Sequence, residues 1–149
     1  MQVQDIMTEN PMCAEPSTSL QDIARMMADC DCGGIPICDP QPRRLVGFVT
    51  DRDIVVRTLA RGLNPMQMSA QDAMTTDLHT IGPNADLAEC IRTMQRHKVR
   101  RVPVTNDQGQ IVGIVSQADL ARRATAMQPE MAEEVEETLE EISAPKMAI

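Results

Sequence analysis

The sequence predicts an α/β (α+β) fold in which two β-α-β-β-α units form the body and an acidic helix follows them. One observation is an internal repeat of 66 to 67 residues, clearest from Gly47 to Asp53 and again from Gly113 to Asp119. The other is that apolar runs of strand length alternate with helical stripes in both copies. Neither copy of the repeat can close a core alone, so we expect the two copies to pack together with pseudo-two-fold symmetry.

The elements follow the same order in both copies. A short extended piece precedes a helix with one apolar stripe, and then come two apolar strands joined by a polar turn and a second helix. The predicted extended pieces lie at 12–15 and 79–81, the strands at 35–38, 45–50, 102–105 and 111–116, and the closing helices at 51–61 and 117–124. We expect a surface linker at 63–71, and domains at 1–66, 67–124 and 125–149.

Composition and charge argue against nucleic-acid binding. Phe48 is the single aromatic residue, so the chain lacks a platform on which bases could stack. The formal net charge is -8, and residues 125–149 hold seven of the 22 acidic residues and one basic residue. A nearly neutral body with an acidic tail does not resemble a nucleic-acid-binding surface.

The sequence shows no sign of a membrane or secretory destination. It contains no apolar run of membrane-spanning length, and its first residues lack the basic and apolar regions of a signal peptide. Five cysteines, an odd number, fit no disulfide framework of a secreted domain. We expect a cytoplasmic protein without a membrane partner.

The repeated turn places a hydroxyl residue before a helix and an aspartate three residues later, as Thr50 with Asp53 and as Ser116 with Asp119. Free N–H groups at a helix start favour an anion, and a carboxylate can accept hydrogen bonds from two neighbouring hydroxyls. Phosphate beside a diol indicates a nucleotide, with its ribose on the aspartate. The alternative is that both pairs only cap their helices, which is the commoner case for a single copy. The duplication favours a site.

Three duplicated patterns together resemble a known family. Asp-x-Met-Thr opens each copy at 5–8 and 72–75, an Ile/Val-Pro-Ile/Val strand surrounds Pro36 and Pro103, and Gly-x-x-Thr/Ser-x-x-Asp ends each strand pair. In this order they resemble a tandem pair of CBS domains, a Bateman module, over about residues 3–124. The segments at 50–54 and 99–104 are especially similar to stand-alone bacterial CBS-pair proteins.

The resemblance implies two clefts between the paired repeats that take adenosine-containing ligands such as AMP, ADP, ATP or S-adenosylmethionine. It implies that the two aspartates hold ribose hydroxyls, that the hydroxyl residues face ribose or phosphate, and that the proline strands line the adenine slot. It also implies arginines aimed at phosphates and a disk-like homodimer. The implied ligand-binding residues are Thr50, Asp53, Ser116, Asp119, Ile35, Pro36, Val102, Pro103, Arg100 and Arg101.

The two implied sites are not equal. The first copy has two glycines where the second has Arg100 and Arg101, so phosphate would depend mainly on the second copy. A surface ion pair is an equally weighted alternative for Arg101. The second copy also has Gln117 and Ala118 in place of an aspartate and an arginine.

The cysteines suggest other chemistry. Cys30 and Cys32 form a C-x-C motif, but a metal site needs three or four ligands, so we interpret them as thiols and predict no metal. Cys13 and Cys38 lie on strands that a β-α-β crossover would make parallel neighbours, within disulfide reach if the register agrees. We therefore expect them to form a redox pair, and we expect Cys90 in the core.

The tail is predicted to form an acidic helix at 129–142. Met131, Val135, Leu139 and Ile142 mark one apolar stripe. The sequence leaves open whether this stripe docks on the body or a second subunit, or remains in solvent.

We predict a regulatory protein that senses an adenosine-containing ligand and signals in trans to an unidentified protein partner. The chain shows no catalytic set around His79 or His97 and no P-loop or dinucleotide motif, so we expect neither an enzyme nor a required cofactor. The alternative hypothesis is a stress-response structural or interaction protein with vacant clefts and the redox-sensitive Cys13 and Cys38.

Overall fold

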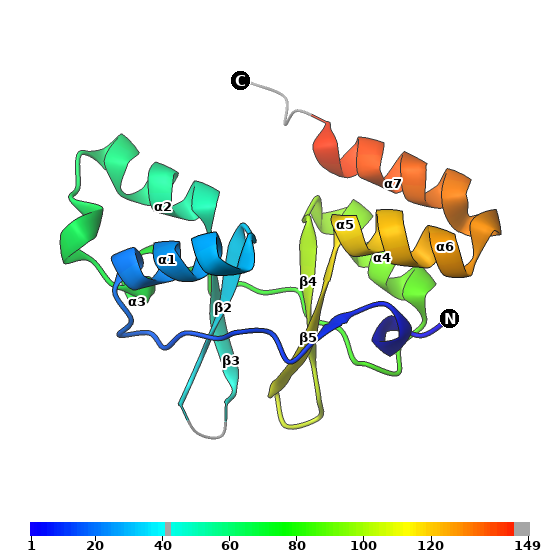
Figure 1. The fold of residues 1–149 in the computed structure, drawn as a ribbon, viewed down its shortest axis with the longest axis horizontal. Coiled ribbons are helices and arrows are strands. Elements are labelled where there is room, and N and C mark those ends of the chain that lie inside the picture. Colours follow the sequence, from blue (N-terminus) through cyan, green and yellow to red (C-terminus); the bar gives the residue numbers. More distant parts are fainter. Residues whose placement is uncertain (41–42, 145–149) are drawn as a thin grey trace. The chain divides into compact units, whose positions relative to one another are not determined.

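The chain forms two compact units that do not follow the order of the sequence. The computed structural model describes residues 1–40 and 43–144. Unit 1 contains Met1–Asn10, His79–Asp107 and the chain from Val112 onward, and unit 2 contains Pro11–Leu78 and Gln108–Ile111. Figure 1 shows the helices and short antiparallel strands of both units, which confirm the predicted mixed α/β class.

Unit 2 is built on a β-hairpin and one long helix. Helix α1 (Leu20–Cys30) begins where the Ser19 hydroxyl accepts a hydrogen bond from the amide of Asp22, and it ends at the left-handed Asp31. Strands β2 (Gly34–Cys38) and β3 (Leu45–Thr50) pair antiparallel, with a bulge between Ile37 and Cys38. Their core consists of Ala14, Leu20, Ile23, Met27, Ile35, Ile37, Val49, Ala70 and Ala73.

The closing helix of the first copy is shorter than the predicted 51–61. Helix α2 (Asp51–Arg57) stops at Thr58, whose backbone leaves the helical region (φ -121°, ψ -78°) and whose hydroxyl donates to the carbonyl of Ile54. A 3-10 turn (Leu59–Arg61) and the left-handed Gly62 follow. The predicted linker contains a 3-10 turn (Pro65–Gln67) and the first residues of helix α3 (Ala70–Ala73).

Unit 1 is a three-stranded sheet with helices. Its strand order is β1 (Thr8–Glu9), β5 (Ile111–Ser116) and β4 (Arg101–Thr105), and helix α4 (Leu87–His97) precedes β4. The closing helix runs beyond the predicted residue 124, as α5 (Gln117–Asp119), a π-helical turn (Leu120–Ala124) and α6 (Thr125–Met127).

The acidic tail docks on its own chain. Helix α7 (Ala132–Ser143), preceded by a 3-10 turn (Pro129–Met131), packs against α4 and the π-helical turn (Figure 1). It buries Val135, Thr138 and Ile142, and the Gln95 amide donates to the Thr138 hydroxyl at 3.0 Å. Of the outcomes that the sequence left open, docking on the body is the one that the structure shows. Within the part of the chain that the structure describes, every helix is too short or too polar to cross a membrane.

The opening segment of each copy pairs with the last strand of the other copy. Thr8 pairs antiparallel with Ile114, and Thr75 makes the corresponding antiparallel bridge with Phe48. The predicted extended pieces at 12–15 and 79–81 contribute only one parallel bridge each, from Ala14 to Ile37 and from Ile81 to Val104. This exchange of opening segments explains why the compact units cross the sequence order (Figure 1).

In each exchanged segment a methionine side chain packs directly against a glycine of the last strand of the other copy. A Cβ atom at Gly47 would lie 2.6 Å from the sulfur of Met74. A Cβ atom at Gly113 would overlap the sulfur of Met7 and approach the carbonyl oxygen of Thr8 to 3.1 Å. The glycines of the repeated turn are thus required for close packing, which a side chain would prevent.

Replacing Gly113 by valine should destabilise unit 1. We expect Gly113→Val to lower the free energy of unfolding by about 1–3 kcal/mol, the usual cost of overpacking. Urea unfolding followed by far-UV circular dichroism measures it, with Gly82→Val as control because a Cβ atom at Gly82 meets nothing within 4 Å. Equal losses in the two variants would contradict the role of Met7.

Candidate functional site

Two turns of equal geometry carry the predicted ribose aspartates. The Thr50 amide donates to Oδ2 of Asp53 at 3.0 Å, and the Asp53 amide donates back to the Thr50 hydroxyl at 3.0 Å. The Ser116 amide donates to Oδ2 of Asp119 at 2.9 Å, and the Asp119 amide donates to the Ser116 hydroxyl at 3.2 Å. Both pairs are capping boxes, as the capping interpretation predicts.

The caps use only one oxygen of each carboxylate. Oδ1 of Asp53 lies 3.8 Å from Nε of Arg57, and Oδ1 of Asp119 lies 3.9 Å from Nε of Arg123. Asp119 is 4% exposed, so its charge is largely removed from water and benefits from the nearby guanidinium. These arginines were not predicted from the sequence, although each stands four residues after its aspartate.

The two arginines connect the capped helices to the exchanged segments. Arg57 Nη1 donates to the carbonyls of Ala73 (3.1 Å) and Met74 (2.9 Å). Arg123 Nη1 donates to the carbonyls of Ile6 (3.2 Å) and Met7 (2.9 Å). Each predicted site therefore combines a hydroxyl residue, an aspartate and an arginine with the Asp-x-Met-Thr segment from the other copy.

The proline strands lie inside the two units. Ile35 and Val102 belong to the hydrophobic cores, at 1% and 0% exposure. The carbonyls of Pro36 and Pro103 accept hydrogen bonds from the amides of residues 14 and 81. These four residues therefore fix the strands beside the caps.

The environment of the second turn contains an unsatisfied acceptor. The Gln117 amide donates to the carbonyl of the exposed Arg100 at 3.0 Å, and the Asp51 amide bonds Gly33 in the same way in the first copy. Arg101 is half-buried at the start of β4. The side-chain oxygen of Gln117 is buried, and among residues 1–40 and 43–144 nothing donates to it. Such a group calls for a donor from water or a ligand.

Cys13 and Cys38 lie together beside an arginine. Their sulfur atoms are 3.3 Å apart, and Nη2 of Arg43 lies 3.2 Å from the Cys13 sulfur. The hydrogen bond from Cys38 lowers the pKa of Cys13 to about 6. Arg43 lowers this pKa further, whereas partial burial raises it. The same hydrogen bond and burial raise the pKa of Cys38. Cys13 is thus the more acidic thiol of the two.

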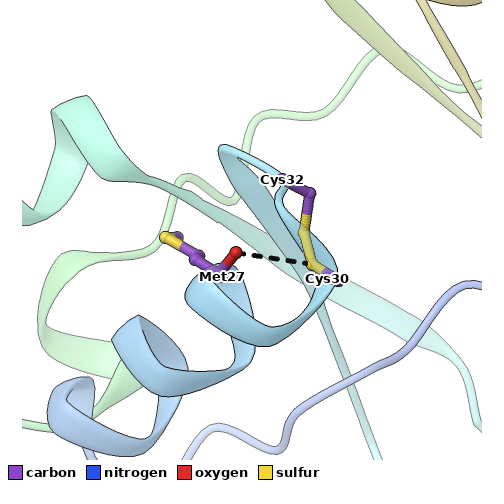
Figure 2. The surroundings of a disulfide bond; sticks show 3 residues. All are labelled: Met27, Cys30 and Cys32. Atoms are coloured by element: carbon purple, nitrogen blue, oxygen red, sulfur yellow. Dashed lines mark hydrogen bonds between the residues drawn. A yellow bond between two sulfur atoms is a disulfide. The ribbon is translucent and has the colours of Figure 1, made fainter.

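The interpretation of Cys30 and Cys32 as thiols is wrong. The structure joins them in a disulfide across the end of α1, with Cα atoms 5.3 Å apart (Figure 2). The left-handed Asp31 between them reverses the chain and brings the two cysteines together. Cys90 is buried as expected, and burial raises its pKa to about 12.

The two histidines form a feature that the sequence did not reveal. The rings of His79 and His97 stack with centroids 3.4 Å apart. Within residues 1–40 and 43–144 no three His, Cys, Asp or Glu side chains converge in a way that could hold a metal ion.

The repeated turns and strands match a family model. The model described as CBS domain matches residues 3–58 and 70–125, so the chain belongs to the CBS-domain family. Hypoxic response protein 1 of Mycobacterium tuberculosis is 39% identical over 118 residues, which cover 79% of this chain and 81% of that protein. The resemblance to stand-alone bacterial CBS pairs, the mycobacterial hypoxic response protein in particular, is confirmed.

Solved structures share the fold. Hypoxic Response Protein I with two coordinated zinc ions has a TM-score of 0.74 at 37% identity, covering 83% of this chain and 98% of that one. The CBS domain pair of protein MJ0100, in complex with methylthioadenosine and S-adenosyl-L-methionine, has a TM-score of 0.73 at 25% identity, covering 82% and 98%. CBSX2 in complex with AMP has a TM-score of 0.76 at 24% identity, covering 85% and 98%, and shows the fold alone.

Removing the guanidinium of Arg123 should loosen the exchanged N-terminal segment. We expect Arg123→Gln to lower the free energy of unfolding by about 1 kcal/mol, because the lost hydrogen bonds are charge-assisted but half-exposed. Hydrogen exchange should accelerate selectively in residues 3–9. The control is Arg122→Gln, which alters an exposed neighbour. Equal exchange in both variants would show that the hydrogen bonds from Arg123 do not hold this segment.

Proposed function

We propose that the chain is a regulatory protein that binds an adenosine-containing ligand in clefts between its repeats and signals to a protein partner in trans. It acts by binding rather than by catalysis. The ligand class is AMP, ADP, ATP or S-adenosylmethionine, and its binding changes the populations of two states with different affinities for that ligand.

The observation that carries this proposal is the half-used carboxylate in both repeated turns. Oδ2 of Asp53 and Asp119 is engaged by the cap, while Oδ1 faces a guanidinium almost 4 Å away. An oxygen at that distance makes a weak ion pair and retains capacity to accept hydrogen bonds. Ribose hydroxyls are donors of the required kind, and the CBS domain pair of protein MJ0100, which shares this fold, carries methylthioadenosine and S-adenosyl-L-methionine.

The second turn is the stronger candidate site. Its aspartate is the more buried of the two, and Ser116 donates a further hydrogen bond to it at 3.0 Å. Gln117, two residues before Asp119, has a buried side-chain oxygen that accepts no hydrogen bond from the residues that the structure describes. The exocyclic amino group of adenine could donate to this oxygen. Arg100 and Arg101 supply positive charge for a phosphate. The first copy has Gly33 and Gly34 at the corresponding positions and lacks this charge.

Calorimetry on the reduced protein tests the ligand and the site. We expect saturable heat with at least one of AMP, ADP, ATP and S-adenosylmethionine, and at least about tenfold weaker binding by Asp119→Ala, because it loses hydrogen bonds to a charged acceptor. Asp86→Ala is the matched control, since Asp86 caps α4 in the same unit with its own carboxylate. Equal weakening by both variants would assign Asp119 to capping alone.

We also propose that a second copy covers the outer face of α2 and the turns after it. This apolar face consists of Val55, Val56, Leu59, Leu63 and Met66, exposed by between 43% and 61%. In unit 1 the helix α7 covers a helical face, whereas no described element of unit 2 covers these residues. Five exposed apolar side chains within twelve residues of the chain indicate an interface.

Leu59→Glu should weaken self-association. A charge at the centre of an apolar interface typically costs at least tenfold in affinity. Sedimentation equilibrium measures the dissociation constant. Met127→Glu, which alters an exposed methionine in unit 1, should leave it unchanged. A wild type that remains monomeric at high concentration would refute this interface.

A second candidate function is that of a stress-response interaction protein with vacant clefts and a redox-sensitive cysteine pair. The specific observation in its favour is the 3.3 Å separation of the Cys13 and Cys38 sulfur atoms. It differs from the first in requiring no nucleotide. The absence of heat with all four ligands would therefore favour it.

A further inference from the structure

We propose that Cys13, Cys38 and Arg43 form a stoichiometric switch for hydroperoxides, in which Cys13 attacks the peroxide, Cys38 resolves the product and Arg43 activates Cys13. The inference rests on the second candidate function and deepens it, because it names the oxidant class and assigns a separate role to each residue.

The backbone holds the two sulfur atoms in reach of each other. The Ala14 amide donates to the carbonyl of Pro36 at 3.0 Å, and the Cys38 amide donates to the carbonyl of Ala14 at 2.9 Å. These bonds join the residue after Cys13 to both sides of Ile37, so the sulfur separation is set by a parallel bridge. A disulfide can form from this arrangement with small side-chain movements.

Arg43 supplies a positive charge at the attacking sulfur. Its Nη2 donates to the Cys13 sulfur at 3.2 Å and also to the carbonyl of Pro11. The residue occupies the left-handed region with φ 65°, which is uncommon for a side chain other than glycine. Such a conformation costs free energy and persists where the surroundings enforce it, as they do at functional sites. The guanidinium stabilises the thiolate, which is the reactive form of a cysteine.

The surroundings assign different roles to the two cysteines. Cys13 is partly exposed and has its pKa lowered by Cys38 and Arg43. Cys38 is 2% exposed, and its pKa is raised by the bond to Cys13, by burial and by nearby Asp39. An oxidant from solvent therefore reaches Cys13, the more acidic and more exposed thiol, before it reaches the buried Cys38.

The oxidation of the cysteine pair proceeds in two steps. The Cys13 thiolate attacks the terminal oxygen of R–O–OH, the O–O bond breaks, and the alkoxide leaves as the alcohol after taking a proton from water, which becomes hydroxide. Cys13 is then a sulfenic acid. The Cys38 sulfur attacks the Cys13 sulfur, the S–S bond forms, and the departing hydroxide takes the Cys38 proton as water. One hydroperoxide oxidises one dithiol to one disulfide.

The test uses the full chain with hydrogen peroxide as the probe. In Cys38→Ser, dimedone and peptide mass spectrometry should find a sulfenic acid at Cys13; in Cys13→Ser, Cys38 should remain unmodified. In the wild type the same treatment should give the Cys13–Cys38 disulfide. Far-UV circular dichroism checks that each variant is folded, and Cys38→Ala replaces the serine variant if it is not.

The role of Arg43 has its own matched pair of variants. Arg43→Gln should slow the reaction of Cys13 with hydrogen peroxide at pH 7 by about tenfold, the effect of losing one charge-assisted hydrogen bond. The pH midpoint of Cys13 alkylation by iodoacetamide should rise in the same variant. Arg44→Gln changes the adjacent exposed arginine and should alter neither quantity. Identical rates in the two variants would overturn the role of Arg43.

A second oxidant separates this inference from the function on which it rests. Diamide forms disulfides without a sulfenic acid. If diamide closes the Cys13–Cys38 bond and hydrogen peroxide does not, the cysteine pair is redox-sensitive and the hydroperoxide switch is wrong. If neither oxidant closes it, both the switch and the second candidate function are wrong.

Discussion

The structure depends on one exchange: the opening segment of each copy completes the sheet of the other. The antiparallel pairing of Thr8 with Ile114, the seat of Met7 on Gly113 and the bonds from Arg123 act on the same short segment. The first two interactions fix its backbone at the sheet edge, and the arginine satisfies carbonyls that the sheet leaves open. The corresponding contacts of Phe48, Gly47 and Arg57 repeat this arrangement in unit 2.

The proposed ligand site uses groups that the fold already requires. The carboxylates that cap α2 and α5 stand beside the arginines that hold the exchanged segments. A molecule that bonds to the carboxylate therefore acts on the same arginine that holds the sheet edge. This shared use gives a binding event a direct route to the packing of each unit, through two or three hydrogen bonds rather than through a long pathway.

The sequence revealed what is local or repeated. Strands, capping residues and the position of Cys90 follow from periodicity within about ten residues, and the repeat made both turns visible. The arginine contacts were missed because they join residues far apart in the sequence. Arg123 donates to the carbonyls of Ile6 and Met7, which precede it by 117 and 116 positions, and no local pattern encodes such a contact. The early end of α2 depends on the hydroxyl of Thr58, and the disulfide of Cys30 with Cys32 depends on a left-handed Asp31. Such choices between conformations are decided by packing.

The exchange also sets an order for synthesis. The ribosome releases the first ten residues long before Ile114 and Arg123, which hold them, have been made. Most of unit 2 is a continuous stretch, Pro11–Leu78, and its hairpin and its arginine contacts with residues 73–75 are available early. The N-terminal segment must therefore wait, unpaired, while a nearly complete unit 2 forms beside it. Closing so long a loop is slow, which makes this waiting edge the point where a nascent chain is most exposed to a wrong partner.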